Sequence, residues 1–428
     1  MSALAREVDV ERCLYDAYVH AESVVPGPED CDDAQEFQVA STATWSTLKT
    51  LARTFMHRNE VDEREHAMMR KSALASSSDG DALSVVTGRS VRMYRAEDDW
   101  HVPKGGVHKT RVLSISWAFD GLAFVIVQPT KLSVATRVGE ILFDRDISAP
   151  IAFATLAMLK EEDTYDLMSV NLLGAPALLT QRVVLIHGAI VSDTVSRTFG
   201  EGIKRVDGAN WLETQRTLVV LGQKSRASTV VTTWKYFDGS DKSDAALMHL
   251  KTIDCGIDLG PRRSFFALPS ATLSVSVFHD DGECLNVAIT SDTGELSVVQ
   301  ISKSGEYATK LNFRRNVCAA TWWSSVAIAI AFSNGDVVVE HVLTGTNLLG
   351  DAPECFETVA DMVSAPRYVD GIRRARILLM ERPNAGGWRL VSLNERTPLE
   401  LVRAHMDLEE WGSALMLARQ HSLDTDQI

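Results

Sequence analysis

The side chains in this 428-residue chain that could support chemistry do not occur at catalytic spacings. Residues 104–110, Lys-Gly-Gly-Val-His-Lys-Thr, have the composition of a phosphate-binding loop. They lack the G-x-x-x-x-G-K spacing that curls backbone N–H groups around phosphate, and they join two expected strands rather than a strand and a helix. We therefore expect a connecting loop there, and for the same reason we expect a turn at residues 199–202.

The histidines and cysteines are too dispersed to predict a metal site. His57 and His66 are nine residues apart, which places them on opposite sides of a helix. No Cys-x-x-Cys pair occurs among the cysteines, and we expect free thiols in a reducing compartment. The chain also lacks the G-x-S-x-G sequence of a hydrolase nucleophile, and its carboxylate clusters lie in expected loops. We predict no catalytic, cofactor-binding or metal-binding residue, and we expect a protein that is not an enzyme.

Charge and hydropathy exclude two further classes of function. The net charge of −14 argues against a nucleic-acid-binding surface, which needs a basic stripe. Residues 1–30 are acidic and lack the apolar core of a signal peptide. No run approaches the roughly 20 apolar residues that span a bilayer. We expect a cytoplasmic protein without a transmembrane segment.

The elements that dominate the chain are short strands joined by tight turns. Residues 317–343 predict three strands, at 317–323, 326–332 and 337–342, with an Asn334-Gly335 hairpin turn before the last. The middle strand, Val-Ala-Ile-Ala-Ile-Ala-Phe, is apolar on both faces and must be covered on both sides. One three-stranded unit cannot provide that cover, so neighbouring units of the same kind are required.

Similar units recur at residues 112–136, 209–234 and 273–300. Repeats of about 40 to 50 residues with several strands each are typical of a β-propeller. None has the full Gly-His and Trp-Asp pattern of a WD40 repeat. We therefore expect the propeller architecture without strict WD40 repeats, that is, a WD40-like propeller of about seven blades at 76–395. Closure of the ring requires residues 82–87 to lie near residues 388–393. The expected blades are 82–105, 111–146, 150–195, 205–255, 270–313, 317–360 and 372–394.

Helical patterns flank the propeller. Residues 1–75 predict an N-terminal helical segment, with a short helix at 8–21 and a longer one at 34–71 whose Trp45 and Phe55 share one face. That face either packs on the propeller or lies on a membrane or a partner. The expected fold class is therefore all-β with α-helical flanks.

Residues 396–428 predict a pair of helices. Thr397-Pro398-Leu399-Glu400 has the residues of a capping box, with Pro at the first helical position. The first helix is expected to end near His405, and the second to begin near Leu408 and to carry Trp411, Ala414, Leu415 and Ala418 on one face. An uncovered helix pair is typical of the first repeat of an α-solenoid, here apparently truncated. The residues that we expect to dock on partners are Leu401, Trp411 and Leu415.

Two groups of residues resemble a known family. Residues 12–21, Arg-Cys-Leu-Tyr-Asp-Ala-Tyr-Val-His-Ala, resemble the helical opening of the neuroblastoma-amplified sequence (NBAS) family, including its plant members. Residues 388–393, 397–401 and 411–426 resemble its junction between propeller and solenoid. The resemblance covers the layout of the whole chain, and motif-like residues cover about a tenth of it.

The resemblance implies a non-enzymatic subunit of a tethering complex on the cytosolic face of the endoplasmic reticulum (ER). Such a subunit acts in Golgi-to-ER retrograde transport with other tethering subunits and ER SNARE proteins, and it reaches the membrane through these partners. Two alternatives stay open. One is a kinetochore and spindle-checkpoint scaffold of the Rod type, which has a similar plan. The other is a propeller with a ligand-binding or enzymatic site in its central channel.

Overall fold

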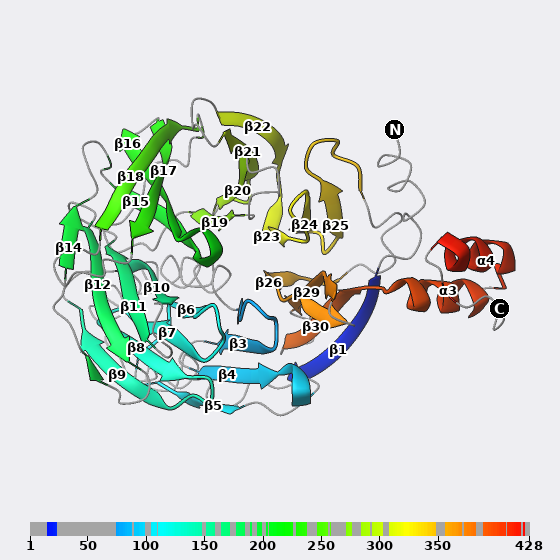
Figure 1. Cartoon of the computed structure of the whole chain (residues 1–428), viewed down its shortest axis with the longest axis horizontal. Coiled ribbons are helices and arrows are strands. Elements are labelled where there is room, and N and C mark those ends of the chain that lie inside the picture. Colours follow the sequence, from blue (N-terminus) through cyan, green and yellow to red (C-terminus); the bar gives the residue numbers. More distant parts are fainter. Residues whose placement is uncertain are drawn as a thin grey trace, which may run out of the picture.

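The computed structural model shows seven small antiparallel sheets arranged in a ring, followed by two helices (Figure 1). It describes residues 15–23 and most of 74–420, together with Leu423. Outside the described part lie residues 1–14 and 24–73 and several connections, the longest of which are 238–245, 258–270, 276–283, 348–355 and 382–387. The helix expected at 34–71 therefore lies outside the described residues.

Each of these seven sheets is one blade, and its strands pair in sequence order except in blades 3 and 7. Blade 1 contains β2 (Leu74–Ser76), β3 (Ala82–Thr87), β4 (Ser90–Arg95) and β5 (Lys104–Val107). Blade 2 contains β6 (Ser114–Trp117), β7 (Ala123–Val127), β8 (Lys131–Thr136) and β9 (Ile141–Asp146). Blade 3 contains β10 (Ile151–Met158), β11 (Thr164–Asn171), β12 (Ala177–Val184), β13 (Ala189–Ile190) and β14 (Val195–Thr198). Blade 4 contains β15 (Arg205–Leu212), β16 (Thr217–Ser225), β17 (Ser228–Phe237) and β18 (Ala246–Asp254).

The remaining blades complete the ring. Blade 5 contains β19 (Ala271–Val275), β20 (Cys284–Ser291), β21 (Leu296–Ser302) and β22 (Ala308–Arg314). Blade 6 contains β23 (Val317–Trp322), β24 (Ala327–Phe332) and β25 (Val337–His341). Blade 7 contains β26 (Val359–Ser364), β29 (Arg376–Glu381), β30 (Trp388–Glu395) and β1 (Tyr15–Ser23). The predicted propeller with about seven blades is confirmed.

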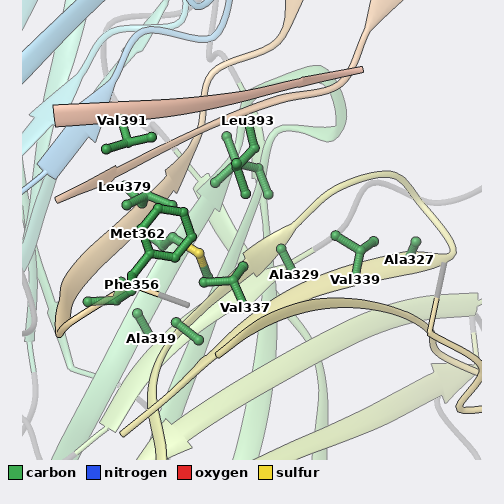
Figure 2. Close-up of a cluster of buried hydrophobic side chains, with 13 residues drawn as sticks. Ala319, Ala327, Ala329, Val337, Val339, Phe356, Met362, Leu379, Val391 and Leu393 are labelled. Atoms are coloured by element: carbon green, nitrogen blue, oxygen red, sulfur yellow. The ribbon is translucent and has the colours of Figure 1, made fainter. Parts of the chain in front are cut away.

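The core lies between neighbouring blades. On β24, Ala327, Ala329 and Ala331 pack against blade 7, while Ile328 and Ile330 on the opposite face pack against blade 5. Figure 2 shows the first of these interfaces, in which side chains of blade 6 meet Phe356, Met362, Leu379, Val391 and Leu393. Because successive strand residues point to opposite faces, a strand covered on both sides must be apolar at every position. This explains the continuous apolar run of β24.

The N-terminal strand β1 corrects one expectation. The helix expected at 8–21 is wrong for residues 15–21, because β1 pairs antiparallel with β30 from Tyr15↔Glu395 to Ser23↔Trp388. Short apolar runs fit a strand or a helix equally well, and here β30 supplies an open strand edge. The propeller therefore includes residues 15–23, and the boundary expected at residue 76 is wrong for these residues.

Blades 7 and 1 meet, as ring closure requires. Leu83 and Val85 of β3 pack with Trp388 and Leu390 of β30 in one buried cluster. Two buried polar contacts join the same blades. The Leu74 backbone N–H donates to Asp361 Oδ2 at 2.9 Å, and Arg376 Nη2 donates to the carbonyl oxygen of Gly80 at 2.6 Å. Burial lowers the pKa of Arg376 to about 10.

Helices α3 (Pro398–Asp407) and α4 (Trp411–Gln420) follow β30 and extend beyond the ring (Figure 1). The predicted capping box is confirmed: Glu400 Oε2 accepts from the Thr397 backbone N–H at 2.6 Å, and the Glu400 N–H donates to Thr397 Oγ1 at 3.3 Å. The second helix begins at Trp411 rather than near Leu408. In the described part of the chain, neither helix has the length or the apolar content to cross a bilayer.

Candidate protein-binding surface

The described residues contain no group of three or more His, Cys, Asp or Glu side chains that could hold a metal ion. Neither Cys255 nor Cys318 forms a disulfide, and both are partly buried. Burial raises the pKa of the Cys255 thiol to about 12. This thiol therefore stays protonated at neutral pH, where it is a poor nucleophile.

A cluster of titratable side chains between blades 3 and 4 has the composition of a catalytic site, but its groups bond to one another. Glu213 Oε2 accepts from Trp211 Nε1 at 2.7 Å and from the Met158 backbone N–H at 3.3 Å. Burial raises the pKa of Glu213, and these hydrogen bonds oppose that shift. Tyr236 donates to Asp166 across the same interface. The arrangement fastens two blades together.

The three residues expected to dock on partners occupy different environments. Trp411 is 49% exposed at the start of α4, and Leu415, one turn later on the same side, is half-buried. Leu401 is half-buried against the core of the helix pair. That core consists of Val402, Ala414, Leu417 and Ala418.

The structure places Trp411 and Leu415 one turn apart on α4, and it places Leu401 on α3 against the buried core of the helix pair. Of the apolar face expected on α4, Ala414 and Ala418 are buried, and Leu417 rather than Trp411 packs beside them. Leu399 and Met416 are exposed large side chains that the sequence pattern did not single out. Their exposure depends on how the two helices face each other, which helical spacing alone does not determine.

The start of α3 is fastened to the last blade. Arg367 Nη2 donates to the carbonyl oxygen of Glu395 at 2.7 Å and lies 3.5 Å from Glu400 Oε2. Glu395 in turn lies 3.4 Å from Arg374 Nη1 and accepts from the Ala375 backbone N–H at 2.7 Å. Because Glu400 also closes the capping box, the same carboxylate orders the helix start and joins it to the propeller.

Arg367 and Arg374 belong to a hairpin that the sequence analysis missed. Strands β27 (Arg367–Val369) and β28 (Ile372–Arg374) pair with each other in the connection that leads from β26 to β29, and they form a small sheet separate from blade 7. The signal was present, since Asp370-Gly371 between Val369 and Ile372 is a strong two-residue turn sequence. Tyr368 is 60% exposed and Ile372 is 54% exposed on this hairpin.

Further exposed apolar side chains lie on the same face of the ring. In an antiparallel blade, the turn after the first strand and the turn after the third strand are at the same end. These turns carry Phe119, Leu122 and Val138 in blade 2 and Leu343 in blade 6, and the hairpin and α3 emerge at the same end of blade 7. Ser78 of blade 1 donates to the Phe119 carbonyl oxygen, and the blade 1 turn also contacts blade 7 through Gly80. The exposed apolar side chains are thus spread over blades 2, 6 and 7, on the face from which the hairpin and α3 emerge.

Comparison with known proteins supports the fold. No protein-family profile matches the chain. The β-propeller domain of Myceliophteria thermophila Cps50 (Swd1) superposes with a TM-score of 0.51 at 9% sequence identity, over 77% of this chain and 97% of that domain. A chain of the Mitotic Checkpoint Complex gives a TM-score of 0.47 at 13% identity, over 76% and 87% of the two chains. The first likeness shows that the chain has the fold of a WD40-like β-propeller.

Proposed function

We propose that this chain is a non-enzymatic scaffold subunit of an ER-associated vesicle tethering complex that acts in Golgi-to-ER retrograde transport. The observation that carries the proposal is the junction between the propeller and the helices. The residues that resemble the NBAS family at 388–393 and 397–401 fall on β30 and on the capped start of α3. These residues lie where β30 joins α3, and a scaffold needs the propeller and the helices to keep a fixed position relative to each other.

The proposed partners are protein chains: other tethering subunits and ER SNARE proteins. Trp411 and Met416 leave apolar surface of α4 exposed at 49% and 55%. Specific interfaces bury roughly 800 Å² per partner around a few such anchors. The propeller serves as the rigid base, and attachment to the ER membrane is indirect, through the bound partners.

A tagged full chain expressed in cells tests the proposal. We expect the protein at the ER, together with tethering subunits and ER SNARE proteins in quantitative affinity purification. The variant Trp411→Glu should lose these proteins, whereas Met248→Glu should retain them, because Met248 is equally exposed but lies on β18 of blade 4. Localisation to kinetochores with spindle-checkpoint proteins would favour the Rod-type scaffold instead.

A further inference from the structure

We propose that one end of blade 2 is a second docking surface, for a basic segment of a partner protein that also carries large apolar side chains. We define this blade 2 surface by Phe119, Leu122, Val138 and Ile141. It belongs to the ring and not to the helix pair, so it is separate from the Trp411 side of α4 (Figure 1). The inference goes beyond the proposed function, because it concerns a different surface of the chain and a different partner segment.

Two turns of blade 2 bring these side chains to one end of the blade. The turn between β6 and β7 carries Phe119 and Leu122. The turn between β8 and β9 carries Val138 and leads into Ile141, the first residue of β9. The Arg137 backbone N–H donates to the Leu122 carbonyl oxygen at 2.8 Å, so the two turns are directly joined.

The strand register places Leu122 and Ile141 on the same side of the blade. Phe124 and Ile141 both pair with Ala135, so these three side chains point to one face of the sheet. Phe124 and Ala135 pack against blade 1, which identifies that face. Leu122 precedes Phe124 by two residues, and its bond to Arg137 continues the β7–β8 pairing, so alternation directs it to the same side.

The four side chains are exposed to a similar extent. The exposed fractions are 44% for Phe119, 42% for Leu122, 52% for Val138 and 45% for Ile141. The described residues include twelve exposed large apolar side chains, and these two joined turns hold four of them. Single exposed apolar residues need no explanation, whereas a group on joined turns is typical of a protein-binding surface.

The turn between β6 and β7 is held in place before a partner arrives. The Gly121 N–H donates to the Ala118 carbonyl oxygen at 3.0 Å. The Asp120 carboxylate accepts from the Leu122 backbone N–H at 3.0 Å and from the Tyr165 hydroxyl group of blade 3. Ordered segments lose less conformational entropy on binding, which favours recognition of a partner segment.

The charge around the blade 2 surface favours a basic partner segment. Ser78 donates to the Phe119 carbonyl oxygen, which joins the blade 1 turn at 77–81 to the blade 2 turns at 118–122 and 137–141. These three turns contain four acidic residues and one Arg, a net charge of −3. None of the four forms an ion pair with another described residue: Asp79, Asp81, Asp120 and Glu140.

Exposed carboxylates remain within reach of a partner. Arg376 of blade 7 attracts Asp79 and Asp81, but its own side chain is buried. Asp81 and Glu140 are exposed, so a Lys or Arg of a partner can approach them. The same carboxylates would repel an anionic lipid surface. A segment with cations beside aromatic or aliphatic residues therefore fits the blade 2 surface better than a membrane does.

A library of short random peptides displayed on yeast tests the proposal with the purified full chain. We expect the enriched peptides to be rich in Lys and Arg and to contain aromatic or aliphatic residues. Fluorescein-labelled copies should bind the Leu122→Ser, Val138→Ser and Glu140→Lys variants on the order of tenfold more weakly than the parent chain. Increasing salt should weaken binding to the parent chain, because exposed charges are screened.

Matched controls use exposed residues elsewhere on the ring. Asp146→Lys makes the same charge change as Glu140→Lys but lies at the opposite end of β9. Met248→Ser removes an exposed apolar side chain from blade 4. Both controls should bind the peptides as the parent chain does, and urea midpoints equal to that of the parent chain should show that every variant is folded.

Absence of enriched peptides, enrichment of acidic peptides, or binding by the three variants equal to that of the parent chain would overturn the proposal. Binding of phosphatidylserine vesicles that is lost in Val138→Ser, without peptide binding, would overturn it in favour of a membrane site. A dimer of the parent chain in sedimentation experiments that Val138→Ser dissociates, without peptide binding, would overturn it in favour of a second copy. Because these assays use purified protein, their failure leaves the tethering proposal untouched.

Discussion

Gly80 lies where the ring closes, and replacing it with alanine should open that junction. Gly80 has a φ of +74°, which costs an L-residue about 1–2 kcal/mol. A Cβ atom there would overlap the Pro366 carbonyl oxygen and lie 2.7 Å from the Ala365 carbonyl carbon. Both are backbone atoms of blade 7, so a side-chain rotation cannot relieve the overlap. Overpacking of this kind costs about 1–3 kcal/mol more.

We therefore expect Gly80→Ala to lower the free energy of unfolding by about 2–5 kcal/mol, as the sum of these two effects. Urea denaturation followed by tryptophan fluorescence measures it. Gly106→Ala is the matched control, because its φ is not positive and no atom lies within 4 Å of the new Cβ. Gly121→Ala should fall between them, with a φ of +67° and its nearest contact at 3.2 Å to Ser77 Cβ. Equal stability of the Gly80 and Gly106 variants would refute the closure described here.

Three further predictions concern individual groups. Thr397→Ala should destabilise the start of α3 by about 1 kcal/mol and speed hydrogen exchange there, with blade 4 amides unchanged as the control. The pKa of Glu213 is raised by folding, so between its pKa in the unfolded chain and its higher pKa in the folded protein the folded protein binds more protons. The contribution of Glu213 to the free energy of unfolding therefore falls as the pH rises from the first of these pKa values to the second. Glu213→Gln should remove that pH dependence from urea midpoints, and identical slopes would contradict it. Cys255, with a pKa of about 12, should react with iodoacetamide near pH 8.5 on the order of a thousandfold more slowly in the folded protein than in urea; equal rates would exclude the burial.

Much of the propeller could be predicted because each blade repeats a local signal. The apolar run of β24 and its Asn334-Gly335 turn specify strands that need neighbours on both faces. The capping box at Thr397 is equally local, since its donors and acceptors are three residues apart. Local chemistry of this kind is visible in one short stretch of sequence.

The errors came from features that depend on distant partners. β1 is a strand because β30, more than 350 residues later, offers it an edge, and nothing in residues 15–23 encodes that edge. The exposure of Trp411 and the half-burial of Leu401 follow from the way α3 and α4 pack together. The β27–β28 hairpin was detectable from Asp370-Gly371, but its attachment to Glu395 and Glu400 required the tertiary structure.

Site-specific photo-cross-linking at Trp411 tests the scaffold proposal most directly. Benzoylphenylalanine in place of Trp411 puts the reactive group on the exposed side of α4, and the same substitution at Met248 provides a control on blade 4. We predict that irradiation of cells links position 411, but not position 248, to tethering subunits or ER SNARE proteins. Adducts with spindle-checkpoint proteins at position 411, or adducts with the same proteins at both positions, would contradict the account.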